Sequence, residues 1–435
     1  MRLGLITAGA AGMYCGSCMH DNTLAAALTA LGHEAYLIPT FTPITTDEPD
    51  VSAKQVFFGG LNVYLEQKFS LFRHTPWVID RLFNTRGMLR VINRFAGKTQ
   101  YHELGEMTVS MLRGKEGNQR KEVDKLVYWL ATELKPELVS LTNVLLSGVV
   151  PEIKRQLGVP IVATLQGDDI FLDALPPAYR QQCIELIRHN DTAIDGYIAT
   201  SRYYADFMAD YLGIARGKIE VVLPGLNLAH YPRTPPAQAN DRPPTIGYFA
   251  RICPEKGLHV LTEAYRLLRR DGGPACRLRI SGWLGPQYRD YFTQLLKELD
   301  VAGLGSEVEH VECPTLDAKI RFMQSLDILS VPTTYREPKG LYVLEALACG
   351  VPVVQPAHGS FPELIEATGG GVLVEPNHPA ALADALRQLL NDPPRRRQLG
   401  QQGQQAVHAR LTAAEMARQT AESFARTIAR GTKHG

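Results

Sequence analysis

Residues 337–354 read EPKGLYVLEALACGVPVV, and this stretch decides the fold of the second half of the chain. It follows the apolar run ILSVP (328–332) and ends in another apolar run, which predicts a strand, a loop, a helix that starts near Gly340 and a further strand. A helix N-terminus presents unpaired N–H groups and suits a phosphate. Glu337 precedes this helix and Glu345 lies inside it, so the two carboxylates could flank a ligand rich in hydroxyl groups. That spacing alone also fits one solvated and one helix-stabilising glutamate.

Short apolar runs alternate with helical patterns over most of the chain, which indicates βαβ units and parallel sheets. The fold class is therefore α/β, with two doubly wound, Rossmann-like parallel-sheet domains. Ligands of such sheets bind at the carboxyl ends of the strands, so a cleft that the two domains face is the expected active site. The predicted strands are 3–7, 34–39, 138–142, 161–165 and 197–200 in the first domain, and 245–250, 277–281, 307–312, 328–332, 352–356 and 371–376 in the second.

One Pro-rich, polar segment interrupts this alternation and is the predicted linker, residues 229–244. It separates a first domain at 1–228 from a second at 245–410. Residues 55–125 fit the alternation poorly and are interpreted as a helical insertion in the first domain. Residues 411–435 have the spacing of one more helix.

The composition is that of an ordinary folded protein, with 435 residues, 45% of them hydrophobic and 21% charged. A net charge of +1 argues against a dedicated nucleic-acid-binding protein. No run of about 18 apolar residues predicts a membrane-spanning helix. Seven cysteines, an odd number, do not make a disulfide framework, and the expected compartment is the cytoplasm.

The N-terminal sequence MRLGLITAGAAGMYCG (1–16) resembles a signal peptide. Its apolar core is short, however, and runs into a Gly-rich turn, so a buried first strand is the preferred interpretation. The next helical pattern is NTLAAALTALG (22–32), with Asp21 and Asn22 as expected N-caps.

The string at 337–354 resembles the signature of the retaining GT-B glycosyltransferases of family 4 (glycosyl transferases group 1). In that signature two glutamates stand on either side of a glycine, and the second opens the pattern E-A-x-A-x-G-x-P-V. In the first domain, the spacing of Gly16 and Gly32 is similar to that of the family's Gly-rich loop and Gly-His turn. Other segments that resemble family elements are GYFARICPEKGLHVL (247–261), RLRISG (277–282), IEVVLPGLN (219–227) and GGGVLVEPNHPAALADAL (369–386).

The resemblance implies how the second domain would bind a nucleotide-sugar donor. Arg251 and Lys256 fall at diphosphate-binding positions, where a guanidinium forks onto phosphate oxygens and an ammonium supplies a point charge. Glu345 would bond the nucleotide ribose, and Glu337 would contact hydroxyls of the donor sugar. Arg251 could instead pair with a nearby carboxylate such as Glu255. The other donor-side positions are Gly16, Gly282 and the backbone N–H groups of Gly340, Leu341 and Tyr342.

The resemblance also implies sugar transfer with retention of anomeric configuration, and a final helix that returns to the first domain. No Asp-x-Asp motif occurs in the sequence, so we expect neither a metal nor a cofactor. Protein cations and a helix dipole would then replace Mg²⁺. The sequence leaves open a UDP-, GDP- or ADP-sugar as donor and a saccharide, a lipid-linked molecule or a small molecule as acceptor.

The first domain departs from the family at ATLQGDDIF (163–171). Many relatives have a histidine where this chain has Gln166, and an amide can hydrogen-bond a hydroxyl but cannot titrate near neutral pH. Gln166, Gly167 and Asp168 are assigned to the acceptor or sugar side, although capping or loop solvation would explain the aspartate equally well. His20 is assigned there too, with a polar loop residue as the alternative.

Two further segments carry open alternatives. Cys15 and Cys18 form a C-x-x-C that fits a redox pair or half of a metal site, or merely small residues in a substrate loop. Residues 68–98 are basic and interleaved with aromatic and aliphatic side chains. Such a segment suits contact with an anionic membrane or with an acceptor that carries phosphate or lipid, or a helical insertion that packs on its own domain.

Three rival functions are also compatible with the sequence. A GT-B nucleotide-sugar epimerase would convert the donor without an acceptor. An inactive sugar-nucleotide-binding protein would bind the donor without turnover. A dinucleotide oxidoreductase would need a stronger glycine fingerprint than TAGAAGMYCG (7–16) offers.

Overall fold

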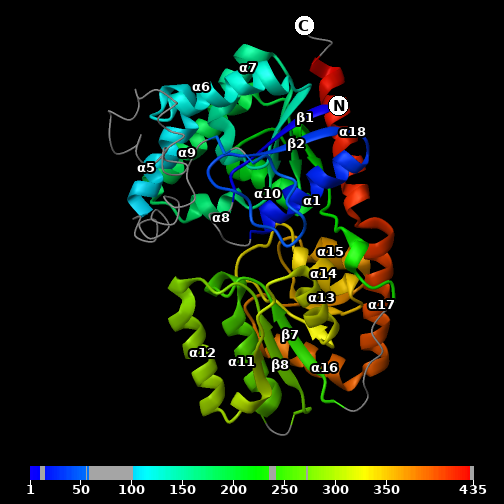
Figure 1. The fold of residues 1–435 in the computed structure, drawn as a ribbon. Helices are drawn as coiled ribbons and strands as arrows, with labels where there is room; N and C mark the ends of the chain where they lie inside the picture. Colours follow the sequence, from blue (N-terminus) through cyan, green and yellow to red (C-terminus); the bar gives the residue numbers. More distant parts are fainter. Residues whose placement is uncertain (10–14, 55, 58–100, 235–241, 271–272, 432–435) are drawn as a thin grey trace. The chain divides into compact units, whose positions relative to one another are not determined.

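The computed structural model describes residues 1–9, 15–54, 56–57, 101–234, 242–270 and 273–431. The chain forms two compact units, Met1–Leu223 with Met416–Gly435, and Pro224–Glu415 (Figure 1). Each unit contains a six-stranded parallel sheet, as the alternation of strands and helices predicts. The basic segment 68–98 and most of the predicted insertion lie outside the described residues.

The first sheet has the strand order β2-β1-β3-β4-β5-β6, and every neighbouring pair is parallel. The order reverses between β1 and β3, which is the switch point of a doubly wound sheet. β6, at the edge of the sheet, was not among the predicted strands. The strands are β1 (Arg2–Thr7), β2 (Glu34–Pro39), β3 (Leu138–Leu141), β4 (Ile161–Leu165), β5 (Gly196–Ala199) and β6 (Ile219–Val221).

Alternate residues of the first sheet face two separate hydrophobic clusters, as the pleat of a strand requires. In β1, Leu5 packs into one cluster and Ile6 into the other, which confirms a buried first strand. Helices α1 (Gly16–Ala30) and α18 (Ala413–Gly431) contribute to the cluster of Leu5. The other cluster contains side chains of α5 (Tyr101–Leu112), α6 (Arg120–Trp129), α7 (Val150–Leu157), α8 (Asp168–Asp173), α9 (Pro177–Asn190) and α10 (Arg202–Leu212).

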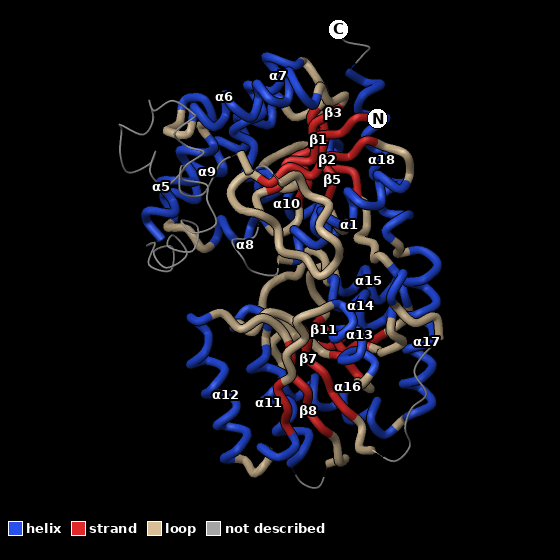
Figure 2. The backbone as a smooth tube through the Cα atoms, viewed as in Figure 1, coloured by secondary structure: helices blue, strands red, loops and turns tan. Residues whose placement is uncertain are grey.

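The second sheet has the strand order β12-β11-β10-β7-β8-β9 and reverses between β7 and β10. Figure 2 shows its strands β7, β8 and β11 with helices beside them. Its strands are β7 (Thr245–Phe249), β8 (Arg277–Ser281), β9 (Val308–His310), β10 (Ile328–Leu329), β11 (Val353–Pro356) and β12 (Gly371–Val374). Its helices are α11 (Leu258–Arg269), α12 (Arg289–Val301), α13 (Leu316–Gln324), α14 (Leu341–Ala348), α15 (Phe361–Thr368), α16 (Pro379–Asn391) and α17 (Pro393–Arg410).

The prediction that Asp21 and Asn22 cap the first helix was wrong. α1 begins at Gly16 with Cys15 at the N-cap, and both polar residues lie buried inside the helix. Their side chains have tertiary partners instead: the Thr7 hydroxyl donates to Asp21, and the Asn22 amide donates to the carbonyl of Pro49. Polar residues that resemble caps in the sequence can therefore serve the interior once a sheet lies beside them.

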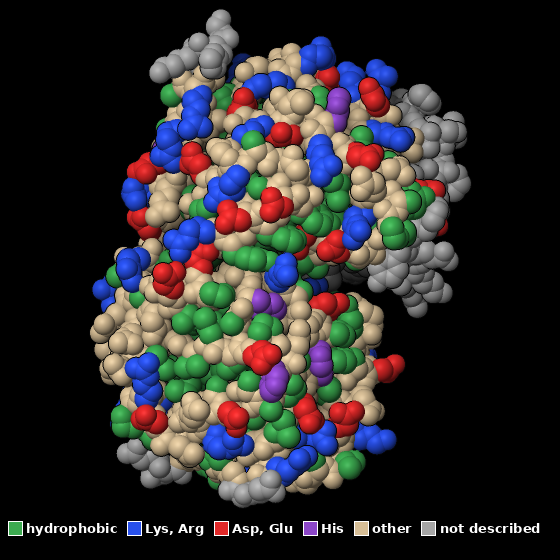
Figure 3. All heavy atoms as spheres, turned by 180° about the vertical axis from the view of Figure 1, so that it is seen from behind, with side chains coloured by type: hydrophobic (Ala, Val, Ile, Leu, Met, Phe, Trp, Pro, Cys, Tyr) green, Lys and Arg blue, Asp and Glu red, His purple; other side chains and the backbone are tan. Residues whose placement is uncertain are grey.

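α18 starts at the end of the second unit and continues into the first. Met416, Ala417 and Phe424 pack in the same hydrophobic cluster as Leu28 of α1, and Arg426 pairs with Glu220. Among the helices of the described residues, none combines the length and the apolar character needed to cross a bilayer. Figure 3 shows acidic and basic side chains interspersed over the face in view.

Gly282, after β8, lies very close to the backbone of Ala250, after β7, and substitution of this glycine tests the packing of the two strand ends. A Cβ at Gly282, where φ is 139°, would stand 1.7 Å from the carbonyl oxygen of Ala250, whereas one at Gly303, where φ is 77°, would meet nothing within 4 Å. We expect Gly303→Ala to cost about 1 kcal/mol, from its backbone conformation alone. Gly282→Ala should cost about 3 kcal/mol or more, since the backbone must also move.

Melting temperatures measured by calorimetry check this difference between the two glycine variants. The Gly303→Ala control should melt about 2–4 °C below the wild type and Gly282→Ala well below that. Equal shifts for the two variants would contradict the close packing of the two strand ends.

Candidate functional site

The predicted donor residues follow neighbouring strands at the switch point of the second sheet. Lys256 lies in the turn between β7 and α11, and Glu337 lies in the loop between β10 and α14. Although 81 residues separate them in the sequence, the Lys256 ammonium donates to Glu337 Oε2 at 2.6 Å. The topology therefore assembles an ion pair at the edge of the sheet where ligands of this architecture bind.

Helix α14 begins directly beside this pair. Gly340 is its N-cap residue, with a φ of 65° that favours glycine, so the predicted helix start is confirmed. The backbone N–H groups of Lys339 and Gly340 donate to Glu337 Oε1 at 3.4 and 3.3 Å. The Glu337 carboxylate is thus an internal anion at the positive end of a helix.

Oxygen Oε2 of Glu337 accepts three side-chain hydrogen bonds. Besides Lys256, the hydroxyl of Tyr335 donates at 2.8 Å and that of Tyr342 at 3.1 Å. With the two backbone donors on Oε1, the carboxylate has five donors while only 4% of the residue is exposed. Because these five hydrogen bonds engage both carboxylate oxygens, the side chain of Glu337 is held in one position.

Burial disfavours the charged form of Glu337, but the Lys256 ammonium and the hydrogen bonds outweigh it. The pKa of this carboxyl is lowered to about 2. Lys256 also lies against two aromatic rings, 4.9 Å from the centre of Tyr335 and 5.2 Å from that of Tyr342. Cation–π contact and the ion pair therefore hold the ammonium in one position.

Glu345 takes part in a second buried ion pair, which the sequence analysis did not identify. Lys319 of α13 donates to Glu345 Oε1 at 2.6 Å, and both side chains are less than a tenth exposed. The signal was present in the sequence: Lys319 lies on the apolar stripe of α13, between Leu316 and Met323, where a charged residue needs a buried partner.

Arg251 and Gly282 follow β7 and β8, and these two strands are paired along their length. The side chain of Arg251 is exposed, while its carbonyl accepts a hydrogen bond from the Tyr248 hydroxyl at 2.9 Å. The structure thus brings Glu337, Lys256, Gly340 and Tyr342 into direct contact, and leaves Arg251 on the surface. Its assigned role toward phosphate stays a prediction.

In the first unit, Gln166 belongs to a buried network at the carboxyl ends of three strands. Its amide nitrogen donates to Asp21 Oδ1 at 3.0 Å and to the carbonyl of Thr142 at 2.6 Å. Asp21 also accepts from the Thr7 hydroxyl at 3.0 Å, and His20 Nδ1 lies 3.3 Å from Asp21 Oδ1. Both amide hydrogens of Gln166 are therefore used by the protein itself.

His20 lies inside α1 and is buried, so the alternative interpretation of it as a polar loop residue was wrong. Gly16 is the first residue of the same helix, ahead of the predicted caps Asp21 and Asn22. Cys15 precedes Gly16, and in the described part of the chain no disulfide joins Cys15 to Cys18. Within the described residues, no group of three or more His, Cys, Asp or Glu side chains could hold a metal ion.

Asp168 organises the loops after β3 and β4. Its carboxylate accepts from the backbone N–H groups of Val144 and Gln166, each at 3.0 Å. Burial raises the pKa of Asp168 to about 6 despite these bonds. The buried hydroxyl of Tyr204 accepts from the N–H groups of Gly167 and Asp168, at 2.8 and 3.0 Å, and donates to Asp169 Oδ1 at 2.5 Å.

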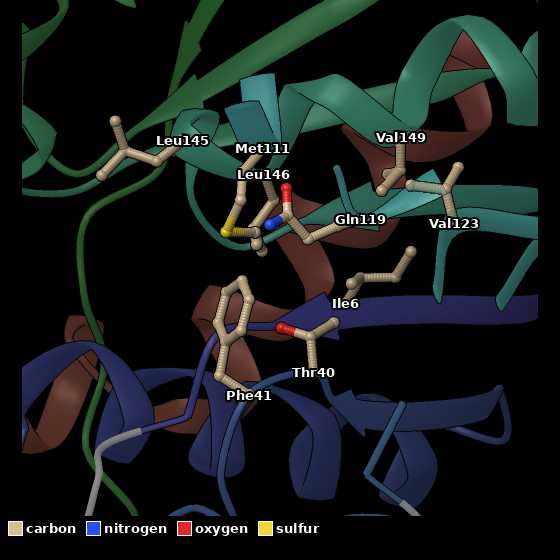
Figure 4. A pocket seen from close by; sticks show the side chains of 9 residues that line it. All are labelled: Ile6, Thr40, Phe41, Met111, Gln119, Val123, Leu145, Leu146 and Val149. Carbon is tan, nitrogen blue, oxygen red and sulfur yellow. The ribbon is translucent and has the colours of Figure 1, made fainter. Parts of the chain in front are cut away.

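A small cavity in the first unit does not coincide with these groups. Its volume is about 10 Å³, the space that one water needs, and apolar side chains dominate its lining (Figure 4). The lining residues are Ile6, Thr40, Phe41, Met111, Gln119, Val123, Leu145, Leu146 and Val149. We interpret this space as a packing defect of the core.

Comparison with known proteins gives the same architecture. Residues 234–406 match the family Glycosyl transferases group 1, and residues 103–230 match Glycosyltransferase Family 4. The sucrose-phosphate synthase of Thermosynechococcus elongatus has a TM-score of 0.70 at 20% identity, with 98% of this chain and 99% of that one covered. Anabaena HepE, solved in complex with UDP and glucose, has a TM-score of 0.68 at 17% identity over 98% of this chain and 100% of its own.

Among curated sequences, the chain is similar to the D-inositol 3-phosphate glycosyltransferase of Nocardia farcinica. The two are 32% identical over 216 residues, which are 47% of this chain and 47% of the relative. The chain therefore spans about half the length of this relative, and the match does not carry the relative's acceptor over to it.

The low pKa of Glu337 predicts a pH-dependent contribution to stability. The carboxyl ionises near 2 in the folded chain and near its ordinary value of 4.5 when unfolded, so its stabilisation is complete above about pH 5 and is lost as the pH falls from there toward 2. Glu337→Gln should therefore melt below the wild type at pH 7. We expect the gap in unfolding free energy to narrow by about 2 kcal/mol between pH 7 and pH 3.

Calorimetric melting of both proteins between pH 7 and pH 3 checks this. Glu366→Gln, on an exposed position of α15, is the control and should keep a constant offset from the wild type. A gap between wild type and Glu337→Gln that does not change with pH would contradict the buried ion pair.

Tyr204→Phe tests the network of the first unit. The change leaves two buried N–H groups and the Asp169 carboxylate without the hydroxyl, and should cost about 2–3 kcal/mol. Tyr211→Phe removes a hydroxyl of the same helix whose hydrogen bond to Asp173 is exposed to solvent, and should cost less than about 1 kcal/mol. Thermal melting distinguishes them, and equal losses would show that the Tyr204 hydroxyl is not the organising contact.

Proposed function

The chain belongs to the GT-B glycosyltransferases of the group 1 and family 4 type, and from this we propose that it transfers a sugar from a nucleotide-sugar donor to an acceptor. The observation that carries the proposal is the Lys256–Glu337 ion pair at the start of α14. It puts a fixed cation and a helix N-terminus together at the switch point of the second sheet, which is an arrangement suited to a diphosphate.

Departure of a nucleoside diphosphate develops negative charge on its terminal phosphate, and preorganised cations and N–H groups stabilise such charge. In the proposed reaction, the bond between the anomeric carbon and the phosphate oxygen breaks, and the same carbon bonds an acceptor oxygen. The proton of the acceptor hydroxyl leaves with the departing phosphate. Lys256, Arg251 and the N-terminus of α14 would stabilise this leaving group without a metal ion.

Retention of configuration is part of the proposal. Its support is the family resemblance, together with the bonding of Glu337. A carboxylate that already accepts five hydrogen bonds is poorly placed to attack the anomeric carbon as a nucleophile. Attack by the acceptor on the face from which the diphosphate departs would retain the configuration and needs no such nucleophile.

The two signature glutamates then have different tasks. Glu337 fixes Lys256 and the first turn of α14, and its contact with sugar hydroxyls would require one of its present donors to move. Among the described residues, the Glu345 carboxylate accepts one side-chain hydrogen bond, on Oε1, and its Oε2 accepts none. This open oxygen is the proposed acceptor for a ribose hydroxyl of the donor.

On the first unit, the proposed acceptor side is the polar edge formed by Gln166, Gly167, Asp168 and His20. The Gln166 amide nitrogen is engaged by Asp21 and Thr142, so its two hydrogens serve the protein rather than a ligand. The identity of the acceptor is left to screening.

A metal-free thermal-shift panel of UDP-, GDP- and ADP-sugars tests the donor site. UDP-glucose heads the panel, and NAD(P) is included because of the oxidoreductase rival. A ligand at about 100 times its Kd adds roughly 2.7 kcal/mol, which should raise the melting temperature by several degrees. We expect a shift with one nucleotide family that Glu345→Ala abolishes.

A shift only with NAD(P), or none with any nucleotide sugar, would contradict the proposal. Sugar transfer is then assayed with the selected donor and an acceptor library, in the presence of EDTA. Conversion of the donor to its epimer without acceptor would favour the epimerase, and binding without turnover would favour the inactive protein.

A further inference from the structure

The two signature glutamates of the second unit are bonded in opposite ways. Glu337 accepts five hydrogen bonds that use both of its oxygens. Glu345 accepts one, from Lys319 to Oε1 at 2.6 Å, and within the described part of the chain its Oε2 has no hydrogen-bond partner. Only 6% of Glu345 is exposed, yet its open Oε2 is not one of the fully buried atoms without a partner, so a ligand at the surface could reach it.

Lys319 and Glu345 come from different helices, so the ion pair can hold the Glu345 carboxylate in one orientation relative to the rest of the unit. Lys319 lies on α13, which precedes β10, while Glu345 lies inside α14, which follows that strand. The side chains of both are more than nine-tenths buried, so water screens their attraction poorly. An ammonium fixed on Oε1 from outside α14 prevents the carboxylate from rotating freely and determines which oxygen stays open.

Charges at this depth need compensating partners, and the Glu345 carboxylate is one partner of the Lys319 ammonium. Burying an isolated carboxylate or ammonium is strongly unfavourable, and removal of one partner leaves the other uncompensated. Lys319 is also the one departure from apolar character on the buried stripe of α13 that includes Leu316, Ile320 and Met323. A methionine or leucine would fill that position without requiring a partner, so the lysine indicates a task beyond packing.

We propose that Lys319 is a positioning residue that holds Glu345 so that its Oε2 meets a hydroxyl of the nucleotide ribose, and that this pair sets the preference for ribonucleotides over deoxyribonucleotides. The inference rests on the proposed function, because it takes Glu345 as part of the donor site. It adds that the selectivity of this site depends on a residue that need not touch the ligand.

The test compares the Kd of UDP with those of 2′-deoxy-UDP and 3′-deoxy-UDP by titration calorimetry, or the GDP or ADP series if the donor panel selects that base. A hydrogen bond to a charged group corresponds to a preference of about tenfold or more for the hydroxyl form. We expect the wild type to show this preference for at least one hydroxyl. Lys319→Met should reduce it to within about twofold, because Glu345 is no longer held.

Lys319→Gln keeps a hydrogen-bond donor but loses the charge, and should show a reduced preference. It carries the test if Lys319→Met does not fold. Arg321→Met is the matched control: it removes one positive charge from an exposed position on the same helix and should retain the wild-type preference. Lys319 variants that fold and keep the full ribonucleotide preference would overturn the inference.

Glu345→Gln separates this inference from the proposed function. Loss of the preference in Glu345→Gln together with its retention in the Lys319 variants would overturn the role of Lys319 alone. Unchanged affinity and preference in Glu345→Gln would overturn the placement of the donor at Glu345, and the inference with it. Loss of the ribonucleotide preference in Glu345→Gln and in the Lys319 variants, with the preference of Arg321→Met unchanged, supports the positioning role of Lys319.

Discussion

The ion pair between Lys256 and Glu337 is the contact that organises the candidate donor site. It joins the turn after β7 to the loop after β10, and these two strands meet at the switch point of the second sheet. The same carboxylate accepts the N–H of Gly340, the N-cap of α14, and the hydroxyl of Tyr342 in its first turn. The buried charge of Glu337 therefore determines three things: where the Lys256 ammonium lies, where α14 begins and how its first turn is oriented.

In the first unit, a neutral amide joins the elements at the switch point of the sheet. At its switch point, the Gln166 amide joins the end of β4 to Asp21 of α1 and to the carbonyl of Thr142 after β3. Tyr204 and Asp168 then hold the loops after β3 and β4 through backbone N–H groups. Buried polar networks of this kind specify one arrangement when every member has a partner. Asp21 also accepts a hydrogen bond from the hydroxyl of Thr7.

Sequence reasoning succeeded where a residue acts through its own backbone or its local pattern. The start of α14 at Gly340 followed from the strand–loop–helix pattern, and the parallel sheets followed from alternation of apolar runs and helices. It failed where a polar side chain serves a distant element. Asp21 resembles an N-cap beside a helical run, yet it bonds Thr7 and Gln166, and the partner of Glu345 lies 26 residues earlier on α13.

The sequence by itself determined the α/β class, the two parallel sheets and the family, because strand and helix periodicity and the string at 337–354 are local properties of the chain. Tertiary structure alone decided which charges meet. Whether Lys256 faces a carboxylate, and which oxygen of Glu345 stays open, depends on strand order and on where helices from distant segments pack. Electrostatic contacts between such segments leave no periodic trace in the sequence, since one lysine at the right depth is enough to make them.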